Sequence, residues 1–170
     1  MTDHVDRVLE QWGRQRPDLD VSPMAVLGRL TRLSRLVTAA QRRTFAAHGL
    51  DAASFDVLAT LRRSDPPHRL TPAELMRSSM VTSGAVTQRL DRLEGRGLVR
   101  RLPSEADGRS VLVALTDEGR AVIDAALPDH LATEEQLLAA LDGPERDALA
   151  GTLRRVLESL GDDLGAGPGA

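Results

Sequence analysis

Residues 71–119 constrain the fold of this chain more than any other segment, because two short helices and a hairpin are expected there in direct succession. Thr71, Pro72 and Glu74 have the order of a capping box, which predicts a helix that begins at Pro72. Residues 77–81 predict the turn that follows it. The succession of elements is one that can place a helix in a DNA major groove.

The second helix of this pair is predicted to have one buried face and one exposed face. It should begin near Thr82 or Ser83 and end at Gly95 or Gly97, because glycine tolerates the left-handed conformation of a helix end. The apolar residues spaced by three and four mark the buried face, and these are Val86, Leu90 and Leu93. Gln88 points away from that face, and the residues that flank it on the outward surface are Gly84, Thr87, Asp91 and Arg92. Small residues, a hydroxyl and an amide suit close approach to base edges.

A two-stranded hairpin is expected after the second helix, with strands over 98–102 and 111–115 and a tip over 103–110. The tip carries Asp107 and Arg109. An arginine at such a tip can enter a narrow minor groove, and a nearby aspartate can hold its guanidinium in place.

The charge of this stretch differs from that of the rest of the chain. Between Arg62 and Arg109 there are ten arginines and six acidic residues, a local charge of plus four, whereas the whole chain carries minus three. A basic middle in an acidic protein is typical of nucleic-acid binding. The alternative is an α+β interaction module that binds no DNA.

Outside this stretch the pattern predicts helices and therefore a mainly α fold with a small β-hairpin. Helices are expected over 3–15, from Ser22 to about His48, over 53–63, over 116–141, and again from Gly143. At 170 residues, the chain is predicted to form one domain over 1–161. The glycine-rich segment 162–170 is predicted to be a flexible tail.

The hairpin residues Asp107 and Arg109, followed by Leu115, Thr116 and Gly119, resemble the signature of the MarR family of regulators. The resemblance implies a winged helix-turn-helix over about 53–116, with dimerisation helices over about 3–48 and 117–161. It also implies a homodimeric transcription regulator, usually a repressor, which a ligand or oxidation releases from two-fold symmetric operator DNA. Because the chain has no cysteine, a thiol switch is excluded and a ligand is expected. The expected DNA contacts are Ser83, Gly84, Thr87, Gln88, Arg92, Asp107 and Arg109.

Four other residues resemble the ligand site of a urate-responsive branch of this family, the HucR and PecS type. They are Trp12, Asp56, Arg89 and Arg101. Arg89 lies about 60° from the centre of the buried stripe of its helix, so it is expected to reach inward. The alternatives stay open: Trp12 in dimer packing, an Asp56–Arg89 ion pair of structural role, and a phosphate contact for Arg101. A MarR-type repressor of a transporter or resistance gene, which answers another aromatic or phenolic ligand, is also compatible with the pattern.

An enzyme is not expected, and no catalytic residue, metal ligand or cofactor is predicted. The four histidines (His4, His48, His68 and His130) are dispersed and lack metal-ligand spacing. The sequence contains no nucleophile elbow, phosphate loop or dinucleotide fingerprint. It also has no apolar run of about 18 residues and no leader, so a cytoplasmic protein without membrane partners is expected.

Overall fold

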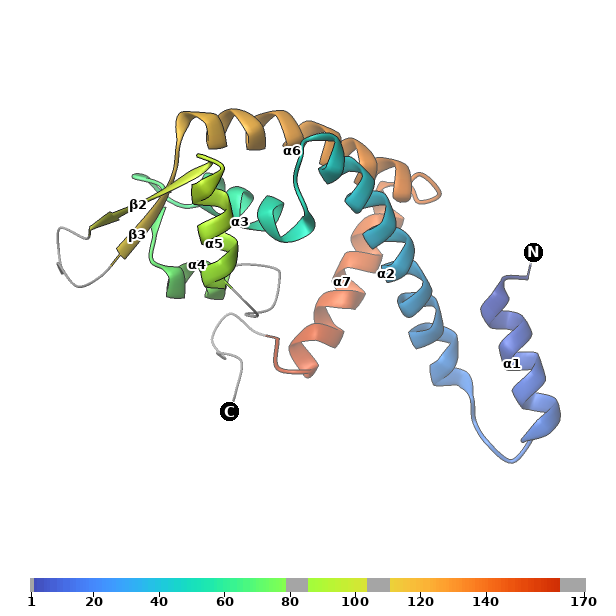
Figure 1. The fold of residues 1–170 in the computed structure, drawn as a ribbon. Helices are drawn as coiled ribbons and strands as arrows, with labels where there is room; N and C mark the ends of the chain where they lie inside the picture. The colour runs from blue at the N-terminus through green and yellow to red at the C-terminus, as the bar shows by residue number, and fades with distance from the viewer. Residues whose placement is uncertain (1, 79–85, 104–110, 163–170) are drawn as a thin grey trace. The chain divides into compact units, whose positions relative to one another are not determined.

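The computed structural model describes residues 2–78, 86–103 and 111–162, and these residues form seven helices and one three-stranded sheet (Figure 1). The chain divides into two compact units, Met1–Arg43 and Thr44–Ala170. Within the described ranges, no helix has both the length and the apolar character that a membrane span requires.

The first unit consists of helix α1 (His4–Gln15) and most of helix α2 (Ser22–Ala47). The Asp3 side chain caps α1 by accepting from the backbone N–H groups of Val5 and Asp6. Arg29 of α2 donates to the carboxylates of Asp3 and Asp6, which joins the two helices at the cap of α1. Val5 is buried and faces Gly28 of α2, where a larger residue would crowd it. Both helices were predicted from the sequence.

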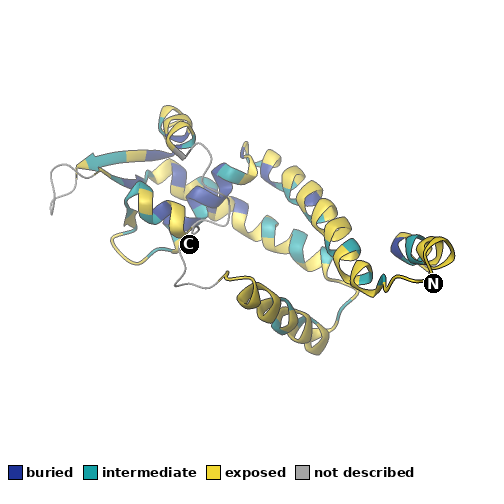
Figure 2. Ribbon diagram, turned by 90° about the horizontal axis from the view of Figure 1, so that it is seen from below, coloured by how far each residue is buried: buried dark blue, intermediate teal, exposed yellow. Residues whose placement is uncertain are grey.

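The second unit is built around helix α3 (Ala52–Arg63), whose Leu58 and Leu61 are fully buried. Helix α4 (Pro72–Ser78) contributes Leu75, and helix α5 (Val86–Gly95) contributes Leu90 and Leu93. Figure 2 shows the buried residues of the chain in dark blue. Helix α4 includes Arg77 and Ser78, which had been assigned to the turn. The rest of the predicted turn and the start of the second helix, residues 79–85, lie outside the described residues.

The sheet holds one strand more than the sequence predicts. Strands β2 (Val99–Pro103) and β3 (Val111–Leu115) pair antiparallel, with Val99 opposite Leu115, as expected for the hairpin. Strand β1 (Arg69–Leu70) pairs with the other edge of β3, so that β3 is central. A strand of two residues is too short for the alternation of apolar and polar residues that reveals strands in a sequence.

Two further helices complete the second unit. Helix α6 (Asp117–Leu137) is capped by Thr116, whose hydroxyl accepts from the Gly119 N–H, and it runs through Pro128. It ends at Leu137 rather than at the predicted Leu141, because the residues after it form turns ahead of the next cap. Helix α7 (Gly143–Ser159) begins at the predicted glycine, where Asp142 and Glu145 form a capping box.

Candidate nucleic-acid interface

Helix α5 presents the outward surface that the sequence predicts. Thr87, Gln88 and Arg92 are exposed, whereas Leu90 and Leu93 are buried in the core. The helix ends where Gly97 adopts a positive φ of 72° and the Leu98 N–H donates to the carbonyl of Leu93. The chain therefore turns directly from α5 into strand β2, so the outward helix face and the hairpin are adjacent parts of one unit.

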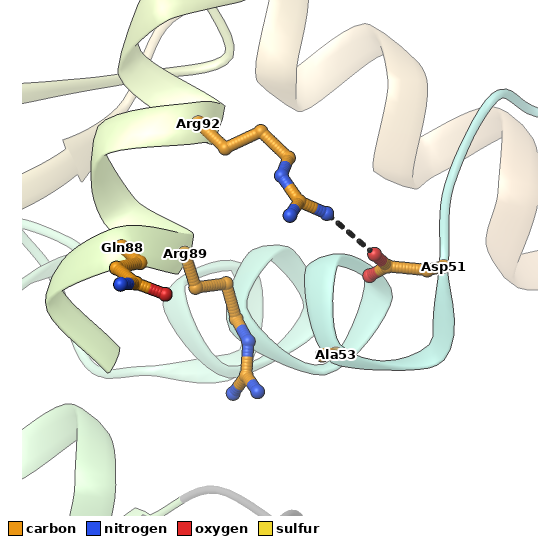
Figure 3. Close-up of a pocket in the computed structure, with 5 residues that line it drawn as sticks. All are labelled: Asp51, Ala53, Gln88, Arg89 and Arg92. Atoms are coloured by element: carbon orange, nitrogen blue, oxygen red, sulfur yellow. Dashed lines mark hydrogen bonds and ion pairs between the residues drawn. The ribbon is translucent and has the colours of Figure 1, made fainter. Parts of the chain in front are cut away.

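A small hollow lies between the beginning of α3 and the outward surface of α5, and Figure 3 shows the residues that line it. The lining residues are Asp51, Ala53, Gln88, Arg89 and Arg92. Arg92 points at Asp51, and its Nη1 lies 3.2 Å from the Asp51 Oδ2. Arg89 is half-buried and lines the same hollow. Arg89 thus lies at the border between the buried and the exposed faces of α5, and its role in a ligand site stays a prediction.

Asp51 has two roles at this hollow. It caps α3 by accepting from the Ser54 N–H at 2.7 Å, and it pairs with Arg92. Burial would raise the pKa of Asp51, but the hydrogen bonds from Ser54 and the charges of Arg92 and Arg89 outweigh it and lower the pKa. Asp51 is therefore ionised at neutral pH.

Arg101 of strand β2 is held by two carboxylates of α5. Its Nη1 lies 2.5 Å from Glu94 Oε2, and its Nη2 lies 2.5 Å from Asp91 Oδ1. Asp91 and then Glu94 raise the pKa of Arg101 despite its partial burial. Its guanidinium is thus already engaged by two carboxylates, and an anionic ligand that binds it would compete with them for its charge.

The other two predicted ligand residues lie in different units. Asp56 is buried in α3, with 7% of its surface exposed, between Phe55 and Val57 of the core. Trp12 is on α1 in the unit Met1–Arg43 and is 42% exposed. The assembly of Trp12, Asp56, Arg89 and Arg101 into one site stays a prediction.

Four predicted DNA contacts, Ser83, Gly84, Asp107 and Arg109, lie outside the described residues. Conversely, the role of Asp51 is not among those predicted from the sequence. An aspartate just before a predicted helix is a capping signal that could have been noticed. Its pairing with Arg92, 41 positions along the chain, has no signal in a single sequence.

Comparison with known proteins identifies relatives along most of the chain. Residues 48–110 match the sequence profile of the MarR family. The HTH-type transcriptional regulator PecS of Dickeya dadantii is 41% identical over 156 residues, which cover 92% of this chain and 94% of PecS.

Two solved structures extend this similarity to the fold. Sco3205, a MarR family transcriptional regulator of Streptomyces coelicolor in complex with DNA, has a TM-score of 0.75 and 26% identity, covering 84% of this chain and 89% of its own. BpsR of Bordetella bronchiseptica, whose DNA binding is regulated by 6-hydroxynicotinic acid, has a TM-score of 0.69 and 27% identity. That match covers 77% of this chain and 91% of BpsR.

Proposed function

The chain belongs to the MarR family of DNA-binding transcriptional regulators, and on this premise we propose that it acts as a homodimeric repressor which a small planar anion, urate or a close analogue, releases from its operator. Like the relatives that it matches, it is a transcriptional regulator and not an enzyme. The observation that carries the ligand part of the proposal is the position of Arg101, a cation on strand β2 that is bound directly to α5.

In this proposal α5 is the helix that reads DNA. Its exposed Thr87 and Gln88 have a hydroxyl and an amide, which can hydrogen-bond to base edges in the major groove. The predicted contacts Ser83 and Gly84 precede them on the chain, and Asp107 and Arg109 would supply the minor-groove contact. A two-fold dimer would place two such helices about 34 Å apart, one turn of DNA.

Exposed apolar residues on the terminal helices support dimerisation. In the unit Thr44–Ala170, six large apolar residues of α6, of α7 and of the C-cap of α7 are exposed among the described residues: Leu127, Leu131, Leu149, Val156, Leu157 and Leu160. Contiguous exposed apolar surface is typical of a protein–protein interface. Removal of residues 145–170 should therefore give monomer or aggregate in analytical ultracentrifugation. A truncated protein that stays a soluble dimer would contradict the proposed interface.

The proposed ligand is a planar heteroaromatic anion. BpsR answers to 6-hydroxynicotinic acid, which, like urate, is a planar heteroaromatic acid. Such an anion needs an aromatic wall and a cation, which Trp12 and Arg101 would supply. Asp56 and Arg89 would link the ligand to α5, since Arg89 belongs to that helix.

The engaged state of Arg101 suggests how the anion would act on DNA binding. An anion on Arg101 would compete with Asp91 and Glu94, and this competition would loosen α5 from strand β2. A coupling free energy of about 1–3 kcal/mol between the ligand site and the DNA site would weaken DNA binding about 5–150-fold. Glu94→Gln, which removes one competing charge, should make the response to ligand stronger.

The experiment titrates urate into the complex of the protein with DNA from upstream of its own gene. Urate should dissociate the complex and change the fluorescence of Trp12, the only tryptophan of the chain. Arg101→Ala and Trp12→Phe should blunt the dissociation. If millimolar urate changes neither the fluorescence nor the complex, urate is rejected as the ligand. Salicylate-like phenolic acids are tested in parallel, and dissociation of the complex by these acids alone would support the alternative ligand class.

A further inference from the structure

The hollow between α3 and α5 holds more positive than negative charge. Arg89 and Arg92 both line it, against the single carboxylate of Asp51, and Gln88 adds an amide group. A guanidinium matches the geometry of a phosphate group and can donate two parallel hydrogen bonds to it. The lining is therefore suited to an oxyanion.

Asp51 is a weak and replaceable partner for Arg92. The contact between Nη1 and Oδ2 is 3.2 Å, and the two side chains are 66% and 53% exposed. Ion pairs with such exposure contribute little, about 0–1 kcal/mol. Asp51 keeps a second anchor at the Ser54 N–H, so it can release Arg92 and still cap α3.

The hollow also lies on the side of α5 that carries Gln88, a predicted contact with bases. From these observations we propose that this hollow binds a backbone phosphate of DNA through Arg92 and Arg89, and that Asp51 occupies Arg92 in the free protein and thereby limits DNA affinity. The inference rests on DNA binding by the family and does not depend on the ligand response.

Asp51→Asn tests this proposal, because asparagine caps a helix as well as aspartate does but has no charge. We expect operator DNA to bind about two- to fivefold more tightly, the factor that corresponds to loss of a surface ion pair. In the parent, DNA binding frees the Asp51 carboxylate from Arg92, and this charge offsets one phosphate contact. The variant has no such carboxylate, so the slope of log affinity against log salt should steepen by up to about 0.9. The helical circular dichroism of the variant should equal that of the parent.

Two further variants show whether the effect belongs to the hollow. Asp124→Asn removes the same charge from another surface ion pair, with Arg62 at 2.7 Å, and should leave DNA affinity unchanged. In an Arg92→Ala background, Asp51→Asn should lose most of its effect. An equal gain for Asp124→Asn, an undiminished gain without Arg92, or no gain for Asp51→Asn would each overturn the proposal.

A last comparison identifies the source of the phosphate. Inorganic phosphate and sodium chloride at equal ionic strength should weaken the Asp51→Asn complex equally, because one free phosphate lacks the other contacts that DNA makes. A loss of binding that is specific to inorganic phosphate, and that needs Arg89 and Arg92, would overturn the assignment to the DNA backbone in favour of a free-anion site.

Discussion

Arg101 and Glu94 are joined twice: the Arg101 backbone N–H donates to Glu94 Oε1 at 3.0 Å, and its Nη1 donates to Oε2 at 2.5 Å. One carboxylate thus holds both the backbone and the side chain of the strand residue. Because Glu94 lies in the last turn of α5 and Arg101 in the middle of β2, this pair fixes the hairpin to the helix that we propose reads DNA.

Glu94→Ala should therefore destabilise the protein. Its loss leaves the Arg101 backbone N–H without that acceptor, and we expect the free energy of unfolding to fall by about 1–2 kcal/mol in urea denaturation. Glu158→Ala, an exposed residue of α7, is the control and should change stability by less than about 0.5 kcal/mol. Equal stability of the two variants would contradict a structural role for Glu94.

Gly119→Ala is expected to be the most disruptive small substitution. A Cβ at this position would lie 1.9 Å from the backbone oxygen of Leu98, and that oxygen also accepts from the Thr116 N–H. Backbone cannot shift as a flexible side chain does, so the free energy of unfolding should fall by about 3 kcal/mol. At about 2–4 °C per kcal/mol for a chain of this size, the Tm should fall by about 6–12 °C.

Gly95→Ala provides the matched control in a calorimetric measurement. No atom lies within 4 Å of the position that its Cβ would take, and its backbone is helical. Alanine there should raise stability by about 0.5–1 kcal/mol. A similar loss in both variants would show that the Leu98 contact is not the cause.

Thr60→Val should stabilise the protein. Thr60 is 1% exposed, and within the described residues its hydroxyl has no hydrogen-bond partner. Valine has the same shape without the buried polar atom, so the free energy of unfolding should rise by about 1 kcal/mol. Thr60→Ser, which keeps the hydroxyl and removes the methyl group, should lower it. A less stable valine variant would mean that the hydroxyl is satisfied in solution.

The acid sensitivity of the fold should depend on Asp51. Because its pKa is lowered in the folded protein, Asp51 stabilises the fold above the unfolded pKa of about 3.9, and this stabilisation is lost as the pH falls through the folded pKa. The parent should be more stable than Asp51→Asn at neutral pH, by at most about 1 kcal/mol because both partners are exposed. The difference should shrink as the pH falls below the unfolded pKa and disappear once the pH is below the lowered pKa of the folded protein. Urea denaturation across this range measures it, and a constant difference would contradict the shift.

The parts of the fold that the sequence predicts are those with a local signal. Capping residues such as Thr116, and the buried spacing of Leu90 and Leu93, depend on neighbours three or four positions away. The ion pairs of Asp51 with Arg92 and of Arg101 with Asp91 depend on tertiary packing. Charge and spacing therefore predict which helix is the candidate for DNA binding, but the ion pairs of Arg92 and Arg101 could be found only in the structure.

Strand β1 has a consequence for solubility. Strand β3 has the sequence VLVAL and no charged residue, which is the kind of segment that pairs with other chains when its edge is open. Arg69 and Leu70 cover that edge by pairing with Ala114 and Val113, while β2 covers the other. These two residues therefore prevent the edge of β3 from pairing with another chain. Mutations that detach strand β1 from β3 should cause precipitation of the protein before any defect in DNA recognition is measurable.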